Sequence, residues 1–210
     1  MKIDTHLHTI YSRDSAIKPQ DLVDAAIAKG LDGVVVTEHW SYKASKPLEK
    51  LKLPEGFVLL RGMEYHTDSG HLLIYGIADD IFDGEYLPIH QVIDAVNARG
   101  GVAVPSHPYK VGYTHQLCDK VFELRGKIPA IETVNGCMPV KVNDMAETAR
   151  MKLGVGGMGG SDAHFIEEVG CAYTEFESEI RTMADLLREI RQGNYIAKYN
   201  VCNRNVRKFK

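Results

Sequence analysis

Short apolar runs alternate along this chain with longer segments in which apolar residues recur every three or four positions. The short runs are typical of buried β-strands, and the longer segments are typical of amphipathic helices. We predict strands over residues 2–7, 33–37, 57–65, 71–77, 101–105, 130–134, 154–158 and 171–176. We predict helices around residues 22–27, 89–96, 142–149 and 183–190, the first of them beginning near Pro19 and ending before Gly30.

The regular alternation of strands and helices indicates an α/β fold with parallel strands joined by right-handed crossovers. Seven or eight such units close more naturally into a barrel than into an open sheet. Residues 1–210 contain no Pro/Ser-rich linker, internal repeat or low-complexity tract, and we therefore predict a single domain.

The composition of the chain argues against some classes of binding partner. The chain has 210 residues and a formal net charge of −3, which argues against nucleic-acid chains and anionic membrane surfaces. The longest apolar runs are too short to span a bilayer. The four cysteines (Cys118, Cys137, Cys171 and Cys202) form no CxxC pair, and Met1 is followed directly by charged residues and histidines rather than by a signal peptide. We therefore expect free thiols and a cytoplasmic protein.

Histidines and carboxylates gather where the predicted strands end. In parallel α/β folds the active site lies at the carboxyl ends of the strands, so these side chains are expected to meet. The residues concerned are His6 and His8, His39, Glu64, His71 at the start of the neighbouring strand, His107, and Asp162 with His164. We infer a common site at this end of the fold.

The spacing of these residues suits a metal ion. Histidines at alternate positions of a strand point to the same face, roughly 6.5–7 Å apart along the chain. Imidazoles and carboxylates without a nearby cysteine favour zinc, manganese or iron. Asp4 and Glu38 precede these ligands, and we expect both to act as supporting hydrogen-bond partners, Asp4 by orienting an imidazole of the first pair.

Five motifs in order, "DTHLHT", "TEH", "GME", "SHP" and "GGSDAH", resemble those of the PHP (polymerase and histidinol phosphatase) family, relatives of the amidohydrolases. The resemblance implies a distorted (β/α)7 barrel that holds two or three divalent metal ions. It departs from the family at "SRDS" around Asp14 and at "TEH", where the family often has "SDG" and "TDH". Transferred by position, the implied ligands are His6, His8, Glu64 and Asp162 for one ion, Glu64, His71 and His107 for a second, and Asp14, His39 and His164 for a third.

The resemblance implies a metal-dependent hydrolase of phosphoric ester bonds, which would attack a small phosphomonoester with a metal-bridging hydroxide. Glu64 and Asp162 would carry the catalytic centre, while Arg13 and Lys110 could bind phosphate oxygens. Three alternatives stay open: an amidohydrolase-type C–N hydrolase, a nuclease or exonuclease, and a non-catalytic metal-binding module. The partner expected is a small phosphorylated substrate, with no membrane and nucleic acid disfavoured.

Other motifs have structural interpretations. The glycine-rich segment 154–160 lacks the GK[ST] of a nucleotide-binding P-loop, so we interpret its glycines as sites of close backbone approach to the metal centre. His66 and His115 can approach the cleft but fit surface or hydrogen-bonded structural positions better. His90 begins an amphipathic helix and is interpreted as structural.

Overall fold

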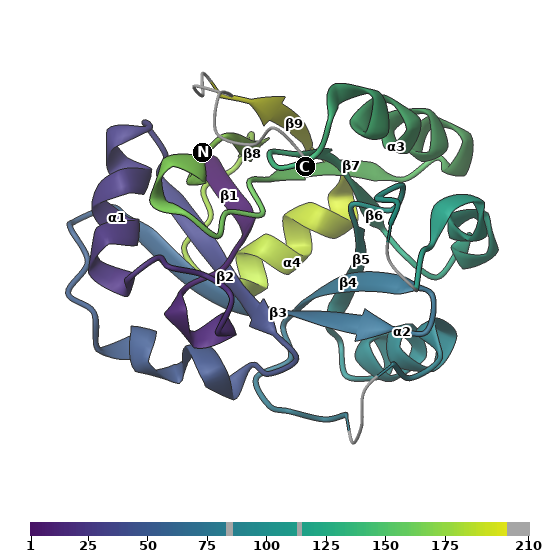
Figure 1. Cartoon of the computed structure of the whole chain (residues 1–210), viewed down its shortest axis with the longest axis horizontal. Coiled ribbons are helices and arrows are strands. Elements are labelled where there is room, and N and C mark those ends of the chain that lie inside the picture. The colour runs from purple at the N-terminus through teal and green to yellow at the C-terminus, as the bar shows by residue number, and fades with distance from the viewer. Residues whose placement is uncertain (83–85, 113–114, 201–210) are drawn as a thin grey trace.

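The computed structural model describes residues 1–82, 86–112 and 115–200, in which two β-sheets curl into a distorted barrel (Figure 1). The larger sheet has seven strands in the spatial order β5 (Val102–Ser106), β4 (Gly70–Tyr75), β3 (Val58–Thr67), β2 (Gly33–His39), β1 (Lys2–Leu7), β8 (Ala172–Phe176) and β9 (Tyr195–Tyr199). The smaller sheet pairs β6 (Ala130–Asn135) with β7 (Gly156–Gly160). The predicted α/β class and distorted barrel are therefore confirmed.

The prediction of parallel strands is correct for some pairs and wrong for others. Strands β1, β2 and β3 are parallel neighbours, as are β6 and β7, but β3–β4, β4–β5, β1–β8 and β8–β9 are antiparallel pairs. The chain turns directly from β3 into β4 through Asp68 and Ser69, a connection too short for the helical crossover that a parallel pair needs. All eight predicted strands form within two residues of their predicted bounds, and β9 is an additional strand.

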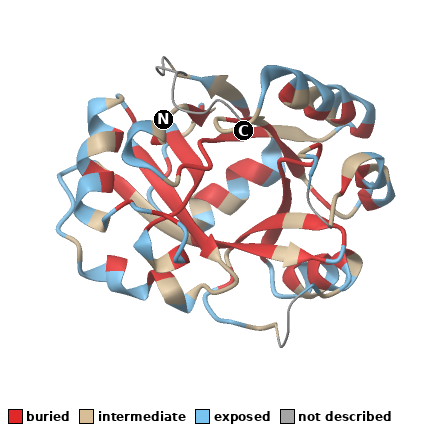
Figure 2. Ribbon diagram, in the orientation of Figure 1, coloured by how far each residue is buried: buried red, intermediate tan, exposed pale blue. Residues whose placement is uncertain are grey.

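In the described part of the chain, four α-helices cover the barrel: α1 (Pro19–Ala28), α2 (Ile89–Ala98), α3 (Val140–Leu153) and α4 (Met183–Gln192). Helix α4 begins after Thr182, whose hydroxyl accepts a hydrogen bond from the N–H of Asp185. Its buried Leu186 and Ile190 pack with Ile3 and Val102, which lie near the starts of β1 and β5. Helix α4 thus packs at the end of the barrel opposite to the carboxyl ends of β1 and β5. It lies in the middle of the view in Figures 1 and 2.

Strand register determines which side chains meet at the open end. Parallel pairing sets His39 of β2 opposite Glu64 of β3. Antiparallel pairing sets His66 of β3 opposite His71 of β4, and His71 opposite Ser106 of β5. One slip of register would turn these side chains to the other face of the sheet. The pairing therefore brings ligand-type residues from three strands to one place.

Cysteine state and membrane topology were also predicted. Cys118 and Cys137 are free, but Cys171 is disulfide-bonded, so the prediction of free thiols is wrong for that residue. Cys202 lies outside the described residues. In the described parts of the chain, no helix has the length and apolar character needed to cross a bilayer.

Candidate metal centre

The first group of ligand-type atoms is built on β1. Strand alternation directs His6 and His8 to the same face, and their Nε2 atoms lie 3.2 Å apart. Glu64 Oε2 lies 3.5 Å from His6 Nε2 and 3.3 Å from His8 Nε2. Asp162 Oδ1 lies 3.4 and 3.5 Å from the same two atoms. Four buried side chains thus point their lone pairs at one small volume that could hold a cation.

The other carboxylate oxygen of Glu64 faces a second group. Its Oε1 atom lies 3.0 Å from His71 Nδ1 and 3.1 Å from His107 Nε2. Glu64 is only 1% exposed, and its two oxygens face different sets of histidines. A buried carboxylate with this arrangement can bridge two cations.

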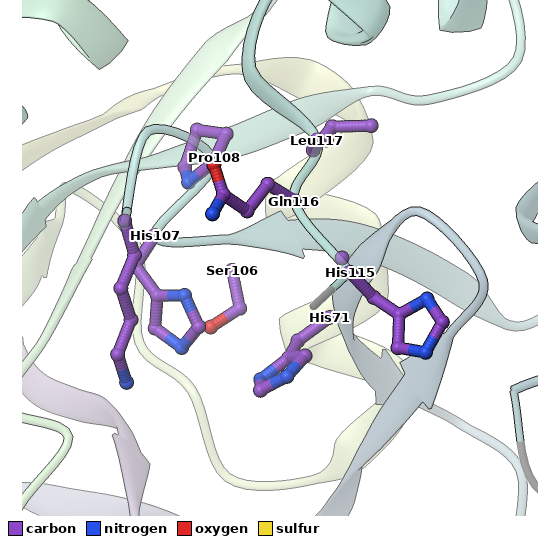
Figure 3. Close-up of a pocket in the computed structure, with 9 residues that line it drawn as sticks. His71, Ser106, His107, Pro108, His115, Gln116 and Leu117 are labelled. Atoms are coloured by element: carbon purple, nitrogen blue, oxygen red, sulfur yellow. The ribbon is translucent and has the colours of Figure 1, made fainter. Parts of the chain in front are cut away.

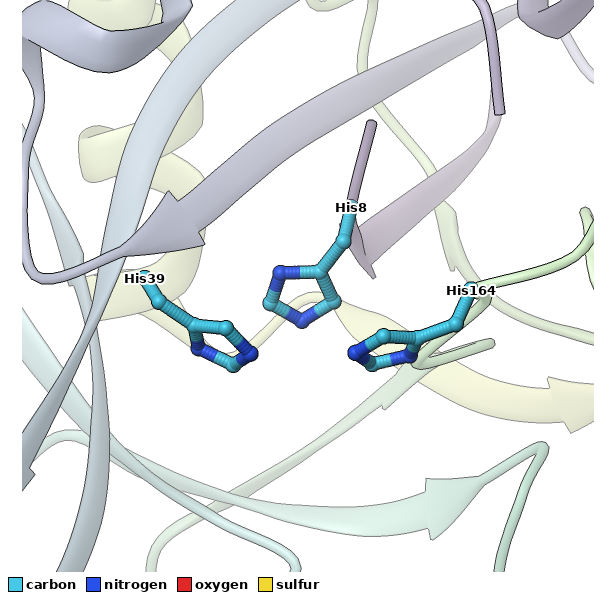
Figure 4. Close-up of side chains that lie close together, drawn as sticks. All are labelled: His8, His39 and His164. Atoms are coloured by element: carbon cyan, nitrogen blue, oxygen red, sulfur yellow. The ribbon is translucent and has the colours of Figure 1, made fainter. Parts of the chain in front are cut away.

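A third group lies toward the surface. Asp14 Oδ2 is 3.1 Å from His39 Nε2 and 3.3 Å from His164 Nε2. The rings of His39 and His164 flank that of His8 at centroid distances of 4.2 and 4.4 Å, and Figure 4 shows the three rings converging. The side chain of Asp14 is 53% exposed, which makes this the most accessible of the three groups.

These three groups share one cavity of about 290 Å³. Its lining includes Asp14, His39, Glu64, His66, His71, His107, Lys110, Cys137, Met138, Asp162 and His164. The structure therefore brings together all nine predicted metal ligands, with His6 and His8 buried beneath the cavity. It also brings in His66, which does approach the cleft.

A smaller pocket lies beside His71 and His107, as Figure 3 shows. His71, Ser106 and His107 form one side, and Lys110 and Gln116 belong to the lining as well. Its volume of about 10 Å³ is near the minimum that one water molecule needs. His115 is at its edge, where its Nδ1 lies 2.9 Å from the carbonyl oxygen of Asp68.

The two predicted phosphate-binding cations differ in position. Lys110 lines the main cavity, and its Nζ lies 3.9 Å from Asp162 Oδ2. Arg13 is exposed and is not among the residues that line the cavity. It ends the short 3-10 helix η1 (Ile10–Ser12) with a left-handed φ of 71°. The structure thus places one predicted cation at the site and the other outside it.

Buried polar partners hold the histidines of β1. Glu132 Oε1 accepts a hydrogen bond from His6 Nδ1 at 2.8 Å, which directs His6 Nε2 toward the first group. On His8, Nδ1 lies 3.0 Å from Ser12 Oγ, and Ser12 in turn donates to Glu38. Glu38 thus has its predicted supporting role. Glu132 was not predicted, although a glutamate inside the apolar strand "AIETV" was a signal for it.

Asp4 has a different role from the one predicted. Its carboxylate accepts hydrogen bonds from the backbone N–H groups of His6, Ser161 and Gly170, at 3.3, 2.8 and 3.0 Å. Complete burial, only partly offset by these bonds, raises its pKa to about 6. Because Asp4 turns toward the backbone amides, it ties three segments together instead of orienting an imidazole.

Close packing and unusual backbone geometry fix the ligands. A Cβ on Gly160 would lie 2.4 Å from the Cβ of His6, so only glycine fits there, as predicted for segment 154–160. His107 and Asp162 adopt positive φ angles of 29° and 55°, conformations that are costly for residues with a side chain. Such strain is concentrated at functional sites.

The charges of the cluster are strongly coupled. Burial alone would raise the pKa of Glu64, but the charges of His6 and His71 and hydrogen bonds from the surrounding histidines hold it well below its usual range. Burial likewise opposes ionisation of Asp162, and the charge of His6 and a hydrogen bond from His8 lower its pKa. Carboxylates that stay ionised while buried need nearby positive charge, which divalent cations can provide.

The pKa values of two histidines at the edge of the cluster are shifted in opposite directions. Burial would lower the pKa of His39, but hydrogen bonds to Asp14 and Glu64 raise it to about 10. For His66, burial is the main cause and lowers the pKa to about 3. His66 is therefore a neutral imidazole near neutral pH.

The barrel gathers histidines and carboxylates at one end, in groups that could hold metal ions. Residues 4–104 match the family model described as the PHP domain, and residues 141–195 match the one described as PHP-associated. The chain belongs to the PHP family of metal-dependent hydrolases.

The chain is also similar to other proteins and to solved structures. An uncharacterized protein of Methanocaldococcus jannaschii is 29% identical over 134 residues, which is 59% of this chain and 77% of that protein. The structure of a two-domain protein of Bacteroides vulgatus containing a predicted PHP-like metal-dependent phosphoesterase is similar at a TM-score of 0.68 and 19% identity. The match covers 95% of this chain but only 65% of that protein.

A structure of Endonuclease Q in complex with a DNA duplex gives a TM-score of 0.70 at 18% identity, with 92% of this chain and 57% of that chain covered. At these identities the likeness of the solved structures shows the fold alone. One neighbour contains a predicted phosphoesterase and the other is an endonuclease, so they leave the substrate class of this chain open. The prediction that nucleic acid is disfavoured remains a prediction.

Proposed function

We propose that this protein is a metal-dependent phosphoesterase that releases phosphate from a small phosphomonoester. The observation that carries the proposal is the third group, Asp14, His39 and His164, beside the pair of groups that share Glu64. A phosphoryl group carries several anionic oxygens and gains from extra positive charge, whereas a neutral amide has little use for it. Divalent zinc, manganese or iron held by these groups would supply an activated hydroxide and neutralise phosphoryl oxygens.

In this proposal each residue of the site has its own role. Glu64 would hold two cations close together through its two oxygens, and Asp162 would complete the first of the two sites. Lys110 would bind a phosphate oxygen, since its ammonium group lies at the cavity wall beside Asp162. Arg13 would reach substrate only from outside the cavity. We propose that residues 1–210 act as one catalytic domain.

The test is a phosphate-release screen of small phosphomonoesters with protein loaded with Mn²⁺, Fe²⁺ or Zn²⁺. His6→Ala and Asp162→Asn should each lower phosphate release by at least ~10³-fold and reduce bound metal, because each removes a ligand of the first site. Asp24→Asn, at an exposed position of α1, is the matched control and should behave like wild type. Full turnover by Asp162→Asn after chelation and defined reloading would overturn the assignment.

The amidohydrolase alternative is separated from phosphoester hydrolysis through the third group. His164→Ala should weaken phosphomonoester hydrolysis by at least ~10²-fold, because it removes charge that clamps the phosphoryl oxygens. Lactams and single-stranded DNA are assayed beside the phosphomonoesters. Faster cleavage of a lactam than of any phosphomonoester would replace the proposal with C–N hydrolysis, and faster cleavage of DNA would replace it with nuclease action.

A further inference from the structure

His66 belongs to none of the three groups that the sequence predicts, yet its ring is fixed beside them. It lies two residues after Glu64 on β3, so both side chains project from the same face of the strand. The ring of His66 stacks on His71 with a centroid distance of 3.7 Å and an interplanar angle of 4°. On another side it packs against Trp40 at 4.4 Å. This packing aims the Nε2 atom of His66 at His39.

Three possible metal ligands meet there. His66 Nε2 lies 3.2 Å from His39 Nδ1, and His39 Nδ1 lies 3.1 Å from Glu64 Oε2. When His66 Nε2 carries no proton, a single proton on His39 Nδ1 can form a good hydrogen bond either to His66 or to Glu64, but not to both. A cation between the three atoms would contact all of them at once.

The distances suit coordination. Ligand atoms at about 2.1 Å from a divalent ion are about 3.0–3.4 Å apart when the angles at the ion are roughly 90–109°. The contacts of 3.1 and 3.2 Å fall in that range. So do the contacts of Asp14 with His39 and His164, at 3.1 and 3.3 Å. His39 thus lies between two possible sites, with one ring nitrogen facing each.

We propose that His39, Glu64 and His66 form an inner position for the third cation, in addition to the outer position formed by Asp14, His39 and His164. A neutral imidazole that coordinates through one nitrogen keeps its proton on the other, so the cation occupies one position at a time. Two nitrogen ligands and one carboxylate suit zinc, manganese or iron. The inference goes beyond the proposed function, because it concerns where cations bind whichever substrate is cleaved.

The experiment removes the outer position and counts cations. Asp14→Ala protein is stripped with a chelator, reloaded with Mn²⁺ or Zn²⁺, analysed for metal per chain, and crystallised for anomalous scattering. We expect three cations per chain both in wild type and in Asp14→Ala, with the third peak beside His66 in the variant. Adding His66→Phe should reduce the count to two. Phenylalanine keeps a flat ring against His71 and Trp40, so a lower cation count would be due to the absence of the imidazole nitrogen.

His90→Ala in the Asp14→Ala background is the matched control and should keep three cations, since His90 lies on α2 away from the cavity. Two cations per chain in Asp14→Ala, with no anomalous peak beside His66, would overturn the inner position. An unchanged count of three after His66→Phe would overturn it as well. Neither readout uses turnover, so failure to release phosphate would leave this result intact.

Discussion

At the scale of single residues, Glu132 controls how His6 faces the metal centre. One oxygen accepts from His6 Nδ1, and the other accepts from the backbone N–H of His107 at 2.7 Å and from Asn135 Nδ2 at 2.9 Å. Both oxygens must therefore act as acceptors. A neutral amide at this position could offer only one acceptor oxygen to these three donors.

Glu132→Gln should therefore weaken metal binding by roughly 10–100-fold with little change in fold. If the amide oxygen keeps the bonds to His107 and Asn135, the NH₂ group faces His6 Nδ1 and favours the tautomer with a proton on Nε2. That proton occupies the metal-binding nitrogen. Competition with a chromogenic chelator measures the affinity, and Glu123→Gln, at an exposed position, is the control. Wild-type affinity in Glu132→Gln would show that the tautomer of His6 is fixed by other contacts.

The raised pKa of His39 predicts a pH dependence of metal binding. In the metal-free protein the pKa of His39 is about 10, so His39 carries a proton at pH 8 that a coordinated cation must displace. Apparent affinity should rise with pH up to about 10. The same proton stabilises the metal-free fold fully below the unfolded pKa of about 6.5, and this contribution is lost as pH rises through 10.

Calorimetric titration in two buffers of different ionisation enthalpy measures the protons released per cation at pH 8. His39→Gln should release fewer protons than wild type. No difference between the two buffers would contradict the prediction.

Sequence alone identified most of the candidate ligands because they lie near the end of a recognisable strand, as His39 follows "GVVV". His71 instead begins a strand, and Asp14 was assigned from the family resemblance. The supporting residues were harder to assign. Asp4 and Glu132 are both carboxylates in buried strands, and only the three-dimensional arrangement shows that one contacts backbone amides and the other an imidazole. His66 was predicted to fit a surface or structural position better than the cleft, because its partners His39 and His71 lie on β2 and β4 and cannot be identified from its own strand.

At the scale of elements, β7 allows the barrel to close tightly. Its sequence is GGMGG, and it lies against β1 so closely that Gly160 has no room for a side chain. Isolated glycines usually weaken a strand, so their concentration here reflects a packing requirement.

Gly160→Ala should push His6 and its strand away, lowering metal content and phosphate release by at least ~10-fold, because a catalytic ligand shifts from its geometry. Gly126→Ala is unsuitable as a control because of its positive φ of 78°, whereas Ala28→Gly on α1 tests a mild backbone change away from β7. Metal analysis and thermal unfolding check the result. Wild-type metal content in Gly160→Ala would show that β1 can shift without cost.

The periodicity of apolar residues predicted where the helices lie better than it predicted which of their residues are buried. Val142, Met145, Ala146 and Ala149 recur at helical spacing, which predicts that they share the apolar face of α3. Met145 is nevertheless 45% exposed, and Asn143 is buried. Asn143 is turned inward because its side chain bonds both the N–H and the C=O of Asn135 at the end of β6. A hydrophobicity pattern cannot reveal such a specific polar contact.

At the scale of the whole molecule, stability and chemistry are located at opposite ends of the barrel. Leu186 and Ile190 of α4 are completely buried against the starts of the strands, whereas the ligands lie at the carboxyl ends of β1, β2 and β3. This separation could be anticipated from the general behaviour of α/β barrels. The position of α4 at the end opposite to the metal centre could not be anticipated, because an amphipathic pattern does not identify the surface that a helix covers.

Leu186→Ala should therefore lower the free energy of unfolding by about 2–5 kcal/mol, as expected for a large-to-small change in a core. Metal stoichiometry and phosphate release per folded molecule should stay at wild-type values at temperatures well below the unfolding transition. Chemical denaturation and metal analysis measure the two properties separately. A loss of bound metal from the folded variant would show that α4 is coupled to the metal centre.

The backbone bonds of Asp4 have a consequence for the order in which the protein can assemble. Asp4 contacts the amides of Ser161 and Gly170, which lie 157 and 166 positions further along the chain. Asp162 must likewise come to His6 before the first group is complete. On a ribosome, β1 therefore emerges long before Ser161, Asp162 and Gly170 are added, and the site around His6 and His8 stays incomplete until then. Such long-range closure is slow, and it leaves the nascent chain dependent on protection from aggregation until residue 170 has been added.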